Sequence, residues 1–120
     1  MARGGLQEVD EALVMRLHEN ALRLGDEARR QFSGDWRRGL DAAGQADVTI
    51  GALAISTRLM EVMTWLLTAQ AVAAHEVSDP GPAVWRASAA PSVLPGRLGE
   101  LAVAVDRLYG RIVATDAEVR

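Results

Sequence analysis

An uncharged segment in the middle of the chain limits what this sequence can fold into. Residues 62–74, VMTWLLTAQAVAA, are 13 consecutive residues without a charged side chain. A membrane-spanning helix needs about 20 predominantly apolar residues, and any longer window here includes Arg58 and Glu61. We therefore expect a buried helix of a protein that does not enter a membrane.

This central helix is expected to be apolar around most of its circumference. One stripe contains Ile55, Val62 and Leu66, and a second, about 100° away, contains Met60, Met63, Leu67, Ala71 and Ala74. A surface helix normally has one apolar stripe and a polar back. Two neighbouring helices can each cover one flank, so the remaining surface must be covered either by the proline-rich segment that follows the helix or by another molecule. The pattern predicts either a homodimer or a groove for a partner, centred on this helix.

Two further helices are expected on either side of it. The first spans residues 9–32, with apolar residues at spacings of three and four and Asp10 as the N-cap. The central helix is placed at 47–75, capped by Asp47. The third spans 96–118, where the apolar residues Leu98, Leu101, Val105, Leu108 and Ile112 repeat as in a coiled coil. No strand-like alternation is present. The expected fold is an all-α, antiparallel three-helix bundle, one domain over 1–120.

A proline-rich linker, residues 78–96, connects the second and third helices. It contains all 4 prolines of the chain, which forbid a long regular helix. Val84, Trp85, Val93 and Leu94 indicate that it folds back onto the bundle. A connection of this length in a compact domain often has a function.

Composition argues against most chemistry. The net charge is −3, so nucleic acid is not an expected partner. The chain has no cysteine, and its 2 histidines, His18 and His75, lie on different predicted elements. No nucleophile, carboxylate pair or phosphate-binding loop stands out. We expect no enzymatic activity, no metal and no cofactor, and, because no apolar leader begins the sequence, a cytoplasmic protein.

Three segments resemble a known protein family. ISTRLMEVMTWLLTAQAV, residues 55–72, resembles the signature helix of the regulator-of-CtrA-degradation (RcdA) family of alphaproteobacteria, whose members carry T-R-L-M followed by S/T-W-L-L. HENALRLGDEARRQF, residues 18–32, and AVDRLYGRIVATDAEV, residues 104–119, resemble its first and third helices. The resemblance implies a dimeric three-helix bundle that acts as an adaptor of the ClpXP protease during the cell cycle.

The resemblance and the central helix together suggest interface residues. Arg58 and Glu61 are three residues apart and could form an exposed pair along the helix, or Arg58 could fix the register of an interface. Trp65 is first of all a packing residue and secondarily a binding hot spot. The full set of candidate dimer or partner contacts is Arg58, Met60, Glu61, Met63, Trp65, Leu67, Tyr109 and Arg111. Expected partners are a second copy, a protease, and other adaptor or response-regulator proteins.

Other functions remain open from the sequence. A small helical DNA-associated regulator would use Arg29, Arg30, Arg37 and Arg38 as phosphate contacts. A structural dimer without adaptor activity has the same apolar helix. A ligand carrier or enzyme would need a cavity with convergent polar groups.

Overall fold

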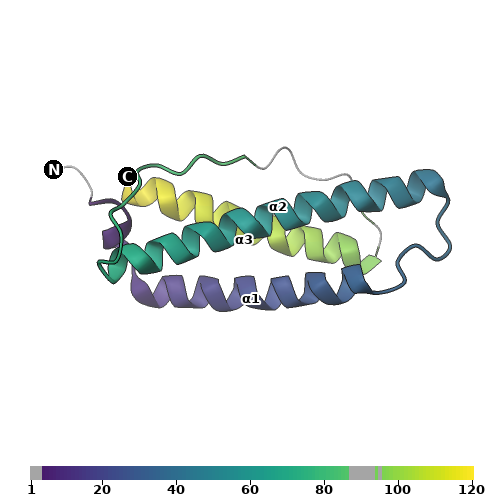
Figure 1. Cartoon of the computed structure of the whole chain (residues 1–120), viewed down its shortest axis with the longest axis horizontal. Helices are drawn as coiled ribbons and strands as arrows, with labels where there is room; N and C mark the ends of the chain where they lie inside the picture. The colour runs from purple at the N-terminus through teal and green to yellow at the C-terminus, as the bar shows by residue number, and fades with distance from the viewer. Residues whose placement is uncertain (1–3, 87–93, 95) are drawn as a thin grey trace.

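The computed structural model describes residues 4–86, 94 and 96–120. A short 3₁₀ helix, η1 (Gly5–Glu8), precedes three long helices, α1 (Glu11–Ser33), α2 (Ala42–Ala73) and α3 (Gly96–Val119). They pack side by side into an elongated bundle of 56 × 23 × 19 Å (Figure 1). The described residues form no strand, and the predicted all-α three-helix bundle is confirmed.

The directions of the helices differ from the antiparallel arrangement that the sequence suggested. α1 is antiparallel to both other helices, but α2 and α3 run in the same direction (Figure 1). Contacts confirm this, because Arg58 pairs with Asp106 and Trp65 pairs with Asp116, so both residue numbers rise together. The reason is the linker. The described residues after α2, 74–86, run back along the bundle toward the end at which α3 begins (Figure 1).

α2 begins earlier than expected, because Asp41 rather than Asp47 is its N-cap. The Asp41 side chain accepts a hydrogen bond from Gly44 N–H at 2.8 Å. Gly44 lowers helix propensity, so the sequence predicted an irregular connection here. The Asp41 cap and the residues that follow nevertheless stabilise the first turn of α2. At its other end α2 closes with a Schellman motif, in which His75 takes a positive φ of 59° and Glu76 N–H donates to Ala71 O.

The other predicted boundaries agree closely with the structure. Asp10 caps α1 through a bond from Ala12 N–H, and α3 covers the coiled-coil repeat of the C-terminal segment. The part of the predicted linker at 87–93 and 95 lies outside the described residues. One element was not expected: η1 places Leu6 over the end of the bundle, where that side chain is buried.

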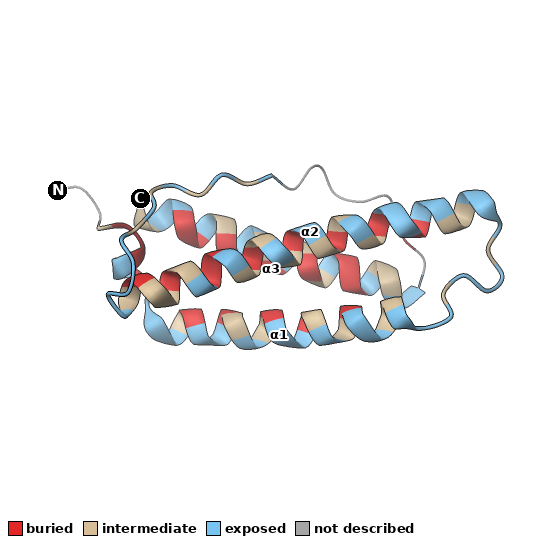
Figure 2. Ribbon diagram, in the orientation of Figure 1, coloured by how far each residue is buried: buried red, intermediate tan, exposed pale blue. Residues whose placement is uncertain are grey.

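The core lies along the common axis of the three helices (Figure 2). Its fully buried large side chains come from every element, and they are Leu6, Leu17, Ile55, Val62, Leu66, Val105, Leu108 and Ile112. The buried stripe of α2 predicted from Ile55, Val62 and Leu66 is therefore confirmed. It faces α1 and α3 and leaves the opposite side of α2 without a cover from either helix.

Candidate functional site

The uncovered side of α2 forms one continuous strip, which we call the outer face. Its ten positions follow one another at alternating spacings of three and four residues, and nine of them are exposed while Ala71 is half-buried. They are Ala43, Ala46, Ile50, Leu53, Thr57, Met60, Thr64, Leu67, Ala71 and Ala74. The large side chains stand well into solvent, with Met60 71%, Leu53 63%, Ile50 62% and Leu67 54% exposed.

No charged residue interrupts the outer face. α2 contains three charged side chains, Asp47, Arg58 and Glu61, and none occupies one of the ten positions. A helix of a water-soluble bundle normally turns its charges outward. In α2, Arg58 is buried at 5% exposure and Glu61 is half-buried. In this part of the helix the charged side chains therefore face inward and the uncharged side faces solvent.

The threonines of the outer face present little polarity to solvent. Thr57 Oγ1 donates to Leu53 O at 2.9 Å, and Thr64 Oγ1 donates to Met60 O at 2.8 Å. A threonine hydroxyl bonded to the carbonyl four residues earlier is satisfied within its own helix. The outer face is consequently a surface of methyl and methylene groups with its hydroxyl donors already used.

The charged residues of α2 bind to α3 and to the linker. Arg58 Nε lies 2.7 Å from Asp106 Oδ1, and its guanidinium lies 5.9 Å from the centre of the Tyr109 ring. Glu61 accepts hydrogen bonds from Tyr109 Oη at 2.6 Å and from the backbone N–H of Arg86 at 2.8 Å. These contacts fix α3 and the linker against one side of α2.

A second polar cluster ties the end of the bundle together. Trp65 Nε1 donates to the buried Asp116 Oδ1 at 3.0 Å, and Arg120 donates to the same oxygen at 2.9 Å. Arg120 also contacts both oxygens of Asp79, at 2.8 and 2.9 Å. Asp79 in turn accepts from Leu6 N–H at 2.8 Å. One cluster thus joins η1, α2, the linker and the end of α3.

The pKa values of Asp79 and Arg120 in this second cluster favour their charged forms. Burial raises the pKa of the Asp79 carboxyl, but hydrogen bonds from Leu6 N–H and the Arg120 guanidinium lower it more, and the net pKa is below the ordinary value. Burial lowers the pKa of Arg120, whereas its two carboxylate partners raise it, and the net shift is upward. Both groups stay ionised in the folded protein at neutral pH.

The eight residues proposed from the sequence separate into an inner and an outer group. Arg58 and Trp65 are buried and Glu61 and Tyr109 are half-buried, all four with partners in their own chain. The predicted Arg58–Glu61 pair along the helix is replaced by contacts with α3. Met63 is half-buried against the core. Met60, Leu67 and Arg111 are exposed, and they remain available as contacts.

Sequence reasoning missed the N-terminal half of the outer face. Ile50 and Leu53 precede the segment on which the sequence argument concentrated, yet both are more than half exposed. The signal was present in the spacing, because the uncharged repeat that contains Met60 and Leu67 continues back through Ile50 to Ala43. Placing the start of the helix at Asp47 removed Ala43 and Ala46 from the repeat, and Ile50 and Leu53 lay outside the segment 55–75 that was considered.

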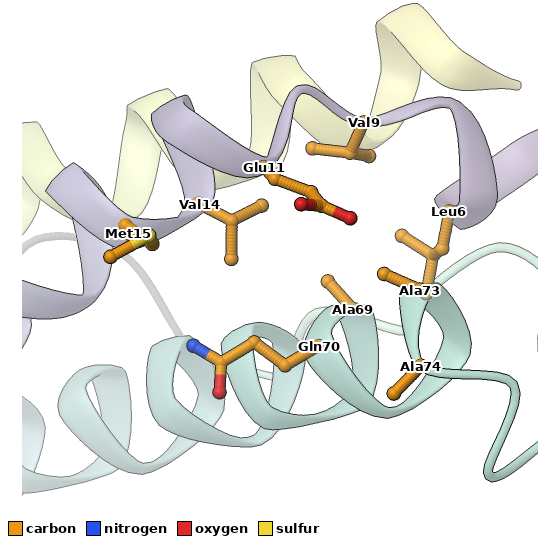
Figure 3. Close-up of a pocket in the computed structure, with 9 residues that line it drawn as sticks. All are labelled: Leu6, Val9, Glu11, Val14, Met15, Ala69, Gln70, Ala73 and Ala74. Atoms are coloured by element: carbon orange, nitrogen blue, oxygen red, sulfur yellow. The ribbon is translucent and has the colours of Figure 1, made fainter.

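A cavity of about 230 Å³ lies between the start of α1 and the end of α2 (Figure 3). Leu6, Val9, Val14, Ala69 and Ala73 line it with apolar groups, and Glu11 extends toward it from α1. Gln70, its other polar neighbour, is bonded to His18 Nδ1 at 2.9 Å. The cavity offers no convergent set of polar groups of the kind that a catalytic site uses.

Other kinds of site find little support in the described part of the chain. The residues that the structure describes contain no group of three or more His, Cys, Asp or Glu side chains that could hold a metal ion. The arginines proposed as phosphate contacts are near carboxylates: Arg29 lies 2.7 Å from Asp26, and Arg38 lies 2.9 Å from Asp35. Arg37 stacks over Trp36 at 4.3 Å.

By length and composition, α2 is a helix that could cross a membrane. In its most apolar window, 39% of the residues are buried inside the bundle. The core helix of a soluble bundle and a spanning helix both satisfy this criterion. Most of the exposed residues of α2 belong to the outer face described above.

The fold and the outer face define a class: a small all-α protein in which the central helix of a three-helix bundle exposes an uncharged side. Within that class, the chain belongs to a family of proteins of unknown function, DUF1465, whose model matches residues 6–120. No curated protein matches the chain, and no solved structure does.

Proposed function

We propose that this protein is a non-enzymatic protein-interaction module of the cytoplasm that self-associates and acts as an adaptor in regulated proteolysis. The observation that carries the interaction role is the outer face of α2, where four large apolar side chains are each more than half exposed. Exposed apolar patches of this extent mark interaction sites. The RcdA-like sequence of α2 and α3 supports the adaptor role and a ClpXP-type protease as partner.

The proposed mechanism is tethering. An adaptor that holds a substrate beside a protease raises the local concentration of the substrate without new chemistry. In this scheme the outer face of α2 is used for self-association, which leaves the surfaces of α1 and α3, including the exposed Arg111, for the protease or a response regulator. A dimer would present each of those surfaces twice.

A reconstituted degradation assay tests this function. A purified ClpXP protease is mixed with a labelled response-regulator substrate, and the rate of substrate loss is measured with and without this protein. Binding to the isolated unfoldase ring is followed in parallel by fluorescence anisotropy. We expect saturable binding and at least a tenfold faster degradation at low substrate concentration.

If this protein neither bound the unfoldase ring nor accelerated degradation of the substrate, the adaptor role would be refuted. If self-association persisted in that case, a structural dimer would be the remaining function. The variant Arg111→Glu, which alters an exposed side chain on α3 away from the outer face, separates the two roles, because it should weaken protease binding and leave self-association unchanged.

A further inference from the structure

The outer face has the spacing of a coiled-coil seam, although it lies on the outside of a folded bundle. Two classes of position alternate along it. The first contains Ala43, Ile50, Thr57, Thr64 and Ala71, and the second contains Ala46, Leu53, Met60, Leu67 and Ala74. Each class repeats every seven residues, as the a and d positions of a heptad do.

We propose that two copies of this protein pair their α2 helices along the outer face, antiparallel, with the twofold axis passing between residues 58 and 59. This inference rests on the self-association in the proposed function and specifies its geometry. In this register Thr57 lies opposite Met60 of the second copy, and Leu53 lies opposite Thr64 of the second copy. The occupant of the outer face is therefore the same face of an identical chain.

The absence of charge favours a second copy as the occupant. A surface that recognises a different protein usually contains charges that steer and select that partner. The ten positions of the outer face contain none, so two such faces meet without repulsion and without an unpaired ion. A twofold interface needs only self-complementarity.

The size of the surface fits a reversible dimer. The outer face runs from residue 43 to residue 74, about 46 Å along the helix and about 10 Å wide, which gives roughly 450 Å² per copy. Exposed apolar side chains flank it on both sides. Met15 of α1 lines the cavity together with Gln70 and Ala74, and Val84 of the linker lines a pocket together with Thr64 and Thr68. Together the two copies bury roughly 1,000–1,200 Å², the lower end of specific interfaces.

The distribution of large and small residues decides the direction. A parallel pair would place Leu53 against Leu53 and Thr57 against Thr57. Large residues would then face each other in one layer and small residues in the next, so no single distance between the two helices would suit both layers. The antiparallel register places each large residue near the centre against a threonine, and Ile50 against Leu67. The alanines at both ends then face each other, Ala43 with Ala74 and Ala46 with Ala71. Antiparallel macrodipoles add to the preference.

Disulfide cross-linking tests this register, since the chain contains no cysteine of its own. The variants Ile50→Cys and Leu67→Cys are made with tags of different mass, mixed and oxidised under mild conditions. In the proposed register the two introduced thiols, one from each variant, meet across the dimer. In a parallel pair each would meet its own counterpart, and the two positions would be about 25 Å apart along the axis.

We expect the mixed disulfide to exceed either single-variant disulfide at least tenfold. Val103→Cys is the matched control, because Val103 is an exposed apolar residue, 51% exposed, on α3, and it should form no disulfide above background. All three positions are exposed, so circular dichroism should show the bundle intact.

The other outcomes overturn the proposal in distinguishable ways. Predominant single-variant disulfides would establish a parallel pair and refute the register. A dimer in sedimentation that forms no disulfide at either position would place the interface elsewhere. A protein that is monomeric at 100 μM, or that partitions onto phospholipid vesicles instead of dimerising, would refute pairing altogether. None of these results bears on the binding of the unfoldase ring, which tests the adaptor function separately.

Discussion

The contact between Trp65 and Asp116 gives a sharp test of how α2 and α3 are held together. Asp116 is 4% exposed and accepts from Trp65 Nε1 and from Arg120. Asp116→Ala removes the acceptor for both donors and leaves the indole N–H buried and unpaired. Hydrogen bonds to a charged group contribute about 1.5–3 kcal/mol, and an unsatisfied buried donor costs about 1–3 kcal/mol. Because these two terms overlap, we expect a loss of about 3–4 kcal/mol in the free energy of unfolding.

The milder variant Asp116→Asn separates charge from hydrogen bonding. An asparagine oxygen can still accept from Trp65, but the ion pair with Arg120 is lost, and Arg120 keeps Asp79 as its second partner. We expect a loss of about 1–2 kcal/mol for this variant. Asp47→Ala, at an exposed position of α2, is the control and should change stability by no more than about 0.5 kcal/mol.

Urea unfolding followed by circular dichroism at 222 nm measures these differences, with the linear extrapolation giving the free energy of unfolding. The protein concentration must be the same for all variants, because self-association adds to apparent stability. If Asp116→Ala were within 0.5 kcal/mol of the unaltered protein, the bond between Trp65 and Asp116 would not hold α2 to α3, and the reasoning about the inner polar contacts would fail.

Three further predictions concern other parts of the molecule. Gly99→Ala should lower the free energy of unfolding by at least about 1 kcal/mol in urea titrations, because its new methyl group would collide with a backbone carbonyl. Gly110→Ala, at a position with nothing nearby, should raise the free energy of unfolding by about 0.5–1 kcal/mol. Equal effects of the two substitutions would contradict this packing. The lowered pKa of Asp79 means that its contribution is complete above the unfolded-state pKa of about 4 and is lost as the pH falls through the lower folded value. Between pH 6 and pH 2, the free energy of unfolding should therefore fall less steeply for Asp79→Asn than for the unaltered protein. Identical slopes for the two proteins would show that the Asp79 carboxyl does not contribute to the pH dependence of stability. Met60→Glu should give a folded monomer in light scattering while Val103→Glu stays dimeric, both being exposed positions; a Met60→Glu variant that unfolds would instead place Met60 in the core.

The sequence predicted the helices because their apolar residues repeat with the helical period. Leu17, Ala21 and Leu24 of α1 occupy the predicted face and are buried. The local signal was equally good for Asp10, whose side chain caps α1. Local patterns of this kind depend on neighbours within one turn, so a single sequence contains them completely.

The direction of α3 and the fate of the charged residues could not be predicted in the same way. Both depend on contacts between residues far apart in the sequence, such as Arg58 with Asp106 and Glu61 with Tyr109. Charged residues on an apolar helix look like surface residues until their partners are known. In α2 these partners turn the charges inward, and the uncharged side is left outside.

The existence of an uncovered apolar side on the central helix could therefore be predicted from the sequence, but its position on the helix could not. The excess of apolar residues on the central helix correctly indicated that two neighbouring helices cannot cover it. Which side stays uncovered was decided by α3, because Asp106, Tyr109 and Asp116 bind the side of α2 that carries Arg58, Glu61 and Trp65.

Sedimentation equilibrium of the unaltered protein across a concentration series tests the central idea most directly, namely that the outer face of α2 is an association surface. The chain has a mass of 12.9 kDa. The weight-average mass should rise from that value toward twice that value as the protein concentration increases through the micromolar range, because an interface of modest area gives a reversible dimer. A mass that stayed at the value of a single chain at every concentration up to 100 μM would contradict it.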